Sequence, residues 1–263
     1  MRFNIFASGL AIALGLAGVG TIGFADVAVA QTAVDARKVE ADRLLQQGIQ
    51  QSEIRQFEAA LQYWQKSLML YRDLKDRRRE GSNLSLLGIA YDSLRNYSKA
   101  IEFYEQSLVI TRELKDRSGE GDVLGVLGSA YDSLGNYPKA IKLQEQRLAI
   151  ARELKDQRGE GRALSLLGSS YSSLNDYPKA IEFLEQSLAI VRKIKDRRGE
   201  GDALSLLGIV HTSLENYPKV IEFQEQSLAI KRELKDRRGE EEALRSLGIA
   251  YLGDFQGKDY LAC

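Results

Sequence analysis

Residues 162–201 read RALSLLGSSYSSLNDYPKAIEFLEQSLAIVRKIKDRRGEG, and closely similar stretches recur along the chain at a spacing of 40 residues. The clearest marker of this period is a glycine, which returns at Gly48, Gly88, Gly128, Gly168, Gly208 and Gly248. Self-similarity at a fixed period predicts structural units that stack on their neighbours, because one such unit cannot bury its apolar face alone. The sequence therefore predicts a solenoid rather than a globular domain.

Each unit begins with the apolar spacing of a helix. Within residues 162–174 the apolar positions lie three or four apart and share one helical face, namely Leu164, Leu167, Gly168, Tyr171 and Leu174. Pro178 follows shortly afterwards, with equivalents at Pro138 and Pro218. Because proline lacks an amide hydrogen and is tolerated in the first turn of a helix, it predicts the start of a second helix.

The second helix, predicted over about residues 177–195, is apolar on two faces. One stripe contains Tyr177, Ala180, Ile181, Leu184 and Leu188, and the other contains Phe183, Ile190 and Ile194. We expect the first stripe to pack on the first helix of its own unit and the second stripe to pack on the next unit. A single isolated unit is then not expected to fold.

Residues 195–201, with the sequence KDRRGEG, are predicted to lie between consecutive helices, and the pattern does not place the helix boundary within them. Gly199 and Gly201 raise the alternative of a basic loop that cradles a phosphate group. No predicted strand precedes this segment, and no Gly-Lys-Ser/Thr motif follows it, so the connecting function is favoured.

The first 30 residues are typical of a signal peptide. Arg2 supplies a positive start, residues 6–24 carry no charge, and Ala28-Val29-Ala30 offers a cleavage site before Gln31. We expect export to the periplasm or the extracellular space, with residues 31–40 as a short polar linker. The alternative is an uncleaved membrane anchor, because the uncharged stretch approaches the length that crosses a bilayer.

Charge and cysteine content exclude several classes of function. The 263 residues include 37 Lys and Arg and 37 Asp and Glu, so the chain lacks the basic excess that general nucleic-acid binding requires. The one cysteine is Cys263, which leaves no intramolecular disulfide and no cysteine metal cluster. We expect no catalytic residues, no metal and no cofactor.

Three residue types that often act in catalysis or ligand binding have structural explanations here, either packing or a solvated helical face. His211 stands in the position of Tyr171, and Trp64 in that of Leu184, so both are interpreted as packing residues. Glu102 and Glu105 fall on a solvated helical face, without the burial that raises the pKa of a catalytic carboxyl group.

The pattern Leu-x-x-Leu-Gly-x-x-Tyr, with an alanine and then an aromatic residue further on, resembles the tetratricopeptide repeat. It is seen at Leu84, Leu87, Gly88, Tyr91, Ala100 and Tyr104. The 40-residue period exceeds the usual repeat of about 34 residues and is similar to kinesin light chains and LGN-type adaptors. The resemblance implies an all-α solenoid, a right-handed superhelix of antiparallel helix pairs. Five units then cover residues 41–241, and residues 242–263 form a truncated sixth unit or a capping helix.

Two departures concern partner specificity. The asparagine that clamps a peptide backbone in LGN-type units is missing, because their Leu-Gly-Asn-Leu-Gly stretch reads Leu164-Ser165-Leu166-Leu167-Gly168 here. The lysine and asparagine set of chaperone-binding members is also absent, with Ser85, Gly125 and Ser165 at one of its positions. Unit one, with Gln46, Gln47 and Trp64, resembles exported bacterial proteins in which repeats precede a caspase-like (CHAT) peptidase domain.

The resemblance also implies an inner groove lined by the first helix of each unit. The residues facing away from the first apolar stripe are Leu86, Ile89, Val126, Ser129, Leu166, Ser169, Leu206 and Ile209. One hypothesis is that they receive an extended or helical peptide of a protein partner; the other is that they pack between consecutive helices. The expected function is a non-enzymatic interaction scaffold. The alternative is the regulatory repeat part of a caspase-like peptidase. We expect no nucleic-acid partner and, after signal cleavage, no membrane contact.

Overall fold

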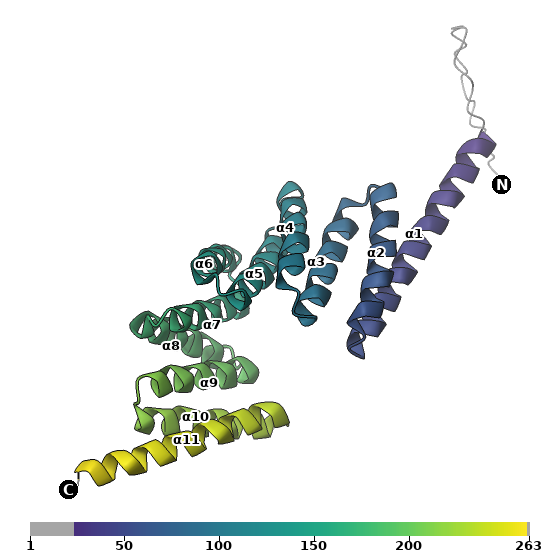
Figure 1. Ribbon diagram of the computed structural model, residues 1–263. Coiled ribbons are helices and arrows are strands. Elements are labelled where there is room, and N and C mark those ends of the chain that lie inside the picture. Colours follow the sequence, from purple (N-terminus) through teal and green to yellow (C-terminus); the bar gives the residue numbers. More distant parts are fainter. Residues whose placement is uncertain (1–23, 262–263) are drawn as a thin grey trace, which may run out of the picture.

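The computed structural model describes residues 24–261, which form helices joined by short turns (Figure 1). The helices are α1 (Phe24–Glu53), α2 (Phe57–Asp73), α3 (Arg77–Ser93), α4 (Tyr97–Glu113), α5 (Arg117–Ser133), α6 (Tyr137–Leu154), α7 (Gln157–Ser173), α8 (Tyr177–Lys193), α9 (Arg197–Ser213), α10 (Tyr217–Glu233) and α11 (Arg237–Leu261). No strand occurs within these residues. The predicted all-α class is confirmed.

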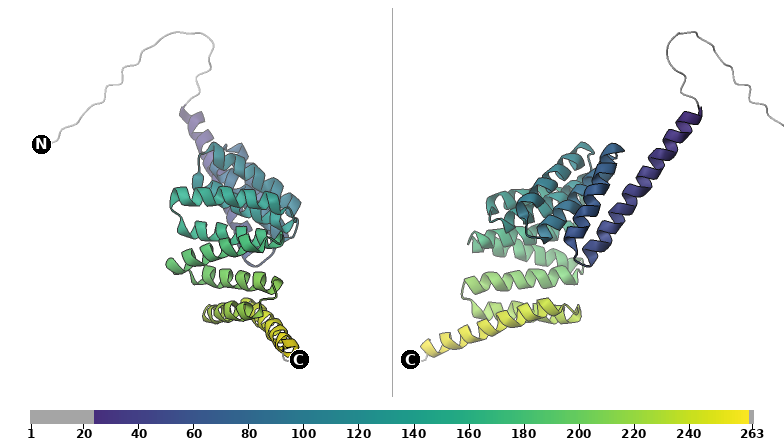
Figure 2. Two further views of the ribbon diagram at one scale, coloured as in Figure 1. Left: turned by 90° about the vertical axis from the view of Figure 1, so that its left-hand side faces the viewer. Right: turned by 45° about the vertical axis from the view of Figure 1, so that its right-hand side comes forward.

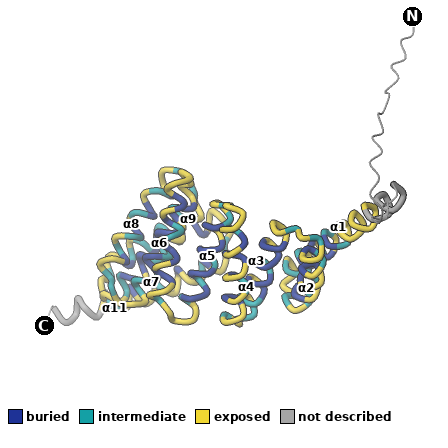
Figure 3. Tube along the Cα trace, turned by 90° about the horizontal axis from the view of Figure 1, so that it is seen from above, coloured by how far each residue is buried: buried dark blue, intermediate teal, exposed yellow. Residues whose placement is uncertain are grey.

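The odd-numbered helices, called A helices here, alternate with the even-numbered B helices along the array. Each helix packs mainly on the helices before and after it in sequence, as expected for a solenoid (Figure 2). Consecutive A helices also approach one another, whereas consecutive B helices make no comparable contacts among the described helices. The A helices therefore line the inner side of the array, and the buried residues run between successive helices (Figure 3).

Turns of three residues connect the described helices, except between α6 and α7, where the turn consists of Lys155 and Asp156. Between α8 and α9 the turn consists of Ile194, Lys195 and Asp196, and Lys195 has a φ of 58°. Asp196 caps α9 by accepting a hydrogen bond from the backbone N–H of Gly199 at 3.1 Å. The expectation that residues 195–201 form a connecting loop is therefore wrong from residue 197 onward, where they form the first turn of α9.

The glycines of this first turn are explained by close packing. A Cβ atom placed on Gly201 would lie 3.0 Å from Cγ2 of Ile230 in α10, so the small residue lets the paired helices approach. The prolines behave as predicted. Pro138, Pro178 and Pro218 each lie in the first turn of a B helix.

The glycine that repeats every 40 residues receives a side chain from the paired B helix. A Cβ atom on Gly168 would lie 2.5 Å from Cγ of Leu184, and one on Gly88 would lie 2.4 Å from Cε1 of Tyr104. The residue that fills this slot is Trp64, Tyr104, Gln144, Leu184 or Gln224 in the five units. Only a residue without a side chain permits this approach, which accounts for the regularity of the glycine.

The two apolar faces of the B helix are both used, but the expected assignment holds only in part. Leu184 of the first stripe fills the slot beside Gly168 of its own unit, as expected. Phe183 stacks on Tyr171 of its own unit with ring centroids 5.4 Å apart, and Ile230 packs on Gly201 of its own unit. Ile141 and Leu148 of α6 instead join a buried cluster with α7, the first helix of the next unit. The wheel thus separates the faces correctly. The second stripe packs on its own unit rather than on the next, and the first stripe contacts both units.

The N-terminal region differs from the expected linker. Residues 31–40 are helical and continue α1, whose first part extends beyond α2 (Figures 1 and 2). The first 23 residues of the predicted signal peptide lie outside the described residues, and the Ala28-Val29-Ala30 site falls within α1. None of the described helices is both long and apolar enough to cross a membrane.

The last helix, α11, is an A helix that packs on α10. Residues 253–257, where the repeat pattern is lost, remain helical within it. A Cβ atom on Gly248 would meet no atom within 4 Å, whereas the equivalent glycines all contact a B helix. Leu244 and Tyr251 are accordingly exposed, with 45% and 50% of their surface accessible.

Candidate peptide-binding groove

The predicted groove residues lie on the inner, A-helix side in two rows. Leu86, Val126, Leu166 and Leu206 are half-buried and occupy the same position in α3, α5, α7 and α9. Three positions later, Ile89 and Ile209 are 41% and 52% exposed, and Ser129 and Ser169 are half-buried. The first row therefore combines packing with an accessible surface, and the second row is more open where it carries isoleucine.

The first row also contributes to the core between units. Leu86 packs against the cluster that contains Trp64 and Leu84, and Leu206 packs against the cluster of α8 and α9. Val126 contacts the cluster of α4, α5 and α6 in the same way. Substituting these residues therefore perturbs packing as well as the exposed surface. A binding experiment on such variants needs a control for folding.

Only part of the predicted set is brought together in one hollow. A pocket of about 370 Å³ is lined by Leu166 and Leu206, between α7 and α9. Leu86 lines a separate pocket of about 400 Å³ between α3 and α5. Ile89, Val126, Ser129, Ser169 and Ile209 line neither of these two pockets.

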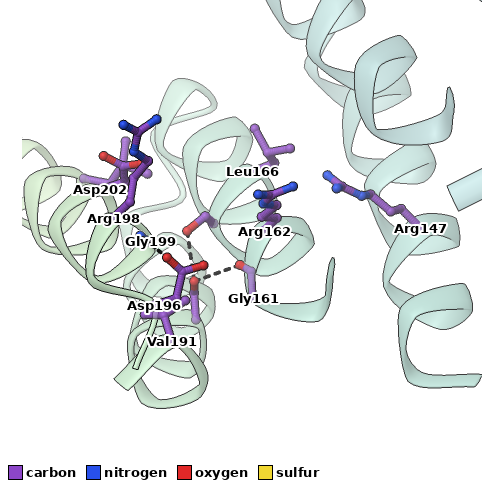
Figure 4. Close-up of a pocket in the computed structure, with 12 residues that line it drawn as sticks. Arg147, Gly161, Arg162, Leu166, Val191, Asp196, Arg198, Gly199 and Asp202 are labelled. Atoms are coloured by element: carbon purple, nitrogen blue, oxygen red, sulfur yellow. Dashed lines mark hydrogen bonds between the residues drawn. The ribbon is translucent and has the colours of Figure 1, made fainter. Parts of the chain in front are cut away.

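The pocket between α7 and α9 contains three arginines that the sequence analysis did not select. They are Arg147 of α6, Arg162 of α7 and Arg198 of α9 (Figure 4). Figure 4 shows Arg147 reaching from α6 with its guanidinium group directed toward Arg162. The signal in the sequence was the replacement, at Arg147, of a serine that the neighbouring units share.

The carboxylates of this pocket are already engaged. Asp202 is ion-paired with the buried Lys231. Asp196 lies 3.1 Å from the guanidinium group of Arg158 and also caps α9. The pocket therefore presents apolar side chains and a surplus of positive charge, an arrangement that favours an anionic ligand.

His211 has the packing role that the sequence predicts. Its ring stacks on Phe223 with the centroids 5.5 Å apart, and its Nδ1 has no hydrogen-bond partner among the described residues. Burial lowers the pKa of His211, and the positive charge of Lys219 lowers it further. Both effects favour the neutral form of the imidazole.

The other residues considered for catalysis or ligand binding also pack in the core or face solvent. Trp64 is 1% exposed, fills the slot beside Gly48, and donates a hydrogen bond from Nε1 to the carbonyl oxygen of Leu45 at 3.2 Å. Glu102 and Glu105 are exposed. No cluster of side chains suited to a metal ion occurs among the described residues.

Comparison with known proteins supports the repeat assignment. A family model described as "Tetratricopeptide repeat" matches residues 44–113, 99–153, 120–193 and 159–233. No match was found among curated proteins.

Several solved structures share the fold. A signal transduction ATPase with numerous domains (STAND) with a tetratricopeptide repeat sensor, from Pyrococcus horikoshii, superposes with a TM-score of 0.70 at 20% identity; the match covers 80% of this chain and 32% of that protein. The chain thus spans about a third of that protein's length. A putative kinesin light chain with nearly identical TPR-like repeats from Podosopora anserina gives a TM-score of 0.59 at 19% identity, covering 78% and 97% of the two chains.

A further similar structure is a Rap protein complexed with Competence and Sporulation Factor. Its TM-score is 0.69 at 15% identity, and the match covers 81% of this chain and 63% of that one. At these identities the likeness establishes the fold alone. With the family model matching most of the chain, the 40-residue period and the glycine slots lead to one conclusion: this protein belongs to the tetratricopeptide repeat family.

Proposed function

We propose that the protein is a non-enzymatic scaffold that binds a peptide segment of a protein partner in the groove formed by its A helices. The observation that carries this proposal is the pocket between α7 and α9, where Leu166 and Leu206 lie beside unpaired cationic groups. Spaced apolar side chains that are half-accessible suit the anchors of an extended or helical peptide. The similar Rap structure holds Competence and Sporulation Factor, which supports partner binding by this architecture.

The test is a selection of short peptides from a displayed random library, followed by binding measurements on variants. Leu166→Asp together with Leu206→Asp is expected to abolish binding of the selected peptides, because two charges replace the apolar floor of the pocket. A matched control is Ala149→Asp together with Ala189→Asp, at exposed positions of the B helices α6 and α8. This control is expected to bind normally.

Folding of the variants is checked by circular dichroism, because Leu206 also packs on the core. A milder pair, Leu166→Gln with Leu206→Gln, keeps the side-chain length and introduces no charge. Unchanged peptide binding by a folded aspartate or glutamine variant would refute the groove. Unfolding of both variants would favour the account in which these residues serve packing alone.

We also propose that the protein is exported, with cleavage after Ala30. The support is the charge pattern of residues 1–30 and the small residues at 28 and 30. Intact-mass measurement of protein from the periplasmic fraction tests this proposal, because cleavage leaves Gln31 as the first residue. A mass that includes residues 1–30 would instead indicate a retained N-terminal anchor.

The alternative function, regulatory repeats of a caspase-like peptidase, rests on the likeness of unit one to exported proteins of that kind. Reading the DNA that follows the codon of Cys263 in all frames tests this alternative. A coding segment with a paired histidine and cysteine in a caspase-like context would support it.

A further inference from the structure

Unit three departs from its neighbours at two facing positions. In units two, four and five, two serines share a hydrogen bond across the helix pair, with oxygens 2.8, 2.9 and 2.7 Å apart. These pairs are Ser85 with Ser107, Ser165 with Ser187, and Ser205 with Ser227. Unit three has Gly125 and Arg147 at the same two positions.

The two exchanges depend on each other sterically. A Cβ atom placed on Gly125 would lie 2.8 Å from Cζ of Arg147, which is too close for an unstrained contact. The loss of the side chain at Gly125 therefore makes the room that the guanidinium group occupies. A serine at position 125 beside Arg147 would force the guanidinium group to move.

Arg147 is held in an unfavourable environment for a cation. It is half-buried, and within the part of the chain that the structure describes it forms no ion pair or hydrogen bond. Burial lowers the pKa of Arg147; Asp122 and Asp156 oppose that effect from a distance, whereas Arg162 adds to it. Because a desolvated charge without a partner costs free energy, an anion that reaches Arg147 gains more than it would at an exposed arginine.

The pocket beside unit two provides a contrast within the same molecule. It keeps Ser85 and Ser107, and its charged lining is Arg78 with Asp116 and Asp122. Arg78 lies 3.6 Å from Asp116, so its charge is already balanced. The charged side chains that line the two pockets therefore differ in net sign. Both pockets are lined by residues of the first row, Leu86 in one and Leu166 with Leu206 in the other.

We propose that Arg147, with Arg162 and Arg198, binds a carboxylate side chain of an acidic peptide whose neighbouring apolar residue contacts Leu166 and Leu206. This proposal rests on the proposed function and specifies the partner's chemistry. It also fixes the position of the peptide along the array. The acidic residue of the peptide lies over units three to five, and the part of the peptide over unit two carries no acidic residue. Charge complementarity selects an acidic peptide over a basic or neutral one.

The experiment uses two matched sets of labelled short peptides and measures fluorescence anisotropy with the full chain. Both sets place leucines at varied spacings, and they differ only in carrying glutamate or glutamine. We expect the wild type to prefer the best glutamate peptide over its glutamine twin by roughly tenfold or more, the range of one charge-assisted interaction. The preference is expected to shrink as salt is raised.

The decisive variant is Gly125→Ser together with Arg147→Ser, which restores the serine pair of the other units and so preserves packing. We expect it to bind the glutamine peptide as well as the wild type does, and to lose the preference for glutamate. Lys142→Ser is the control, because it removes one positive charge from the same helix at an exposed position outside the pocket. That control is expected to keep the preference.

The possible failures are distinguishable. Equal affinity of the wild type for both peptide sets would overturn the assignment of Arg147 while leaving groove binding intact. A glutamate preference retained by the serine pair would overturn it as well. Binding of inorganic phosphate at the pocket without any preference for glutamate peptides would also overturn it. Binding that survives Leu166→Asp with Leu206→Asp would instead contradict the proposed function itself.

Discussion

Substituting alanine for the repeating glycine has opposite consequences at two equivalent positions. At Gly168 the new Cβ atom would lie 2.5 Å from Cγ of Leu184, 2.9 Å from Cδ2 of Leu184 and 3.1 Å from the carbonyl oxygen of Ala180. Carbon atoms in contact prefer about 3.5–4.0 Å, so α7 and α8 must separate by about 1 Å. Overpacking of this kind costs about 1–3 kcal/mol, and the better helix propensity of alanine returns about 1 kcal/mol.

The cost at Gly168 falls in the upper part of this range because a branched carbon and a backbone oxygen cannot move aside. We therefore expect Gly168→Ala to lower the free energy of unfolding by about 1–2 kcal/mol. At Gly248 no atom lies within 4 Å of the new Cβ, so Gly248→Ala is expected to stabilise α11 by about 0.5–1 kcal/mol.

The assay is urea unfolding followed by far-UV circular dichroism for the wild type and both variants. Because repeat arrays open in segments, amide hydrogen exchange of α7 and α11 supplies the local readout. The expected result is earlier unfolding and faster exchange in α7 for Gly168→Ala, and slower exchange in α11 for Gly248→Ala. Equal shifts in the same direction would refute the assignment of the repeating glycine to a packing slot.

Three further predictions follow from the turns, the caps and the histidine. Gly135, with a φ of 76° and open space around it, is expected to lose about 1 kcal/mol of stability on Gly135→Ala, measured by urea unfolding. Asp156 accepts a hydrogen bond from the N–H of Gly159 at 2.9 Å, so Asp156→Ala is expected to cost about 1 kcal/mol and to speed exchange in the first turn of α7. The pKa of His211 is lowered in the folded state, so its contribution to stability is complete above pH 6.5 and declines as the pH falls through the folded pKa. His211→Tyr, which restores the repeat residue, is expected to remove that acid-dependent loss, and an NMR titration that gives a histidine pKa at or above 6.5 would contradict it.

The repeat, the helix pairs and the glycine marker were accessible from sequence because periodicity encodes them directly. The sequence did not reveal which neighbouring helix each face of a B helix contacts. A helical wheel gives the angle between Ile181 and Phe183, but the side on which the next unit lies depends on the turn. That turn places Lys195 in the left-handed region, and no sequence feature at this lysine predicts a positive φ.

The start of the helix within residues 195–201 could not be placed from the sequence, for a physical reason. Gly199 and Gly201 have low helix propensity, which favours a loop, whereas in the folded protein Gly201 lets Ile230 pack closely. The polar composition of residues 31–40 similarly favoured a linker, although the structure shows a continuous helix there.

The candidate site was predictable only in part. The wheel selected the row containing Leu166 and Leu206, which the structure brings into one pocket. Arg147 was not selected, because its importance depends on the facing exchange at Gly125 and on burial between α5 and α6. A comparison of facing positions across all units would have found the paired departure, since Ser165 with Ser187 shows what it replaces.

The most direct test of the account is photo-crosslinking of a selected peptide that carries a photoreactive residue next to its acidic position. Mass spectrometry of the crosslinked chain locates the site of contact. The account predicts crosslinks to the inner surface of α7 and α9 around Leu166 and Leu206, and to α6 near Arg147. Crosslinks concentrated on the exposed faces of the B helices, such as that of α8 around Ala189, would contradict it.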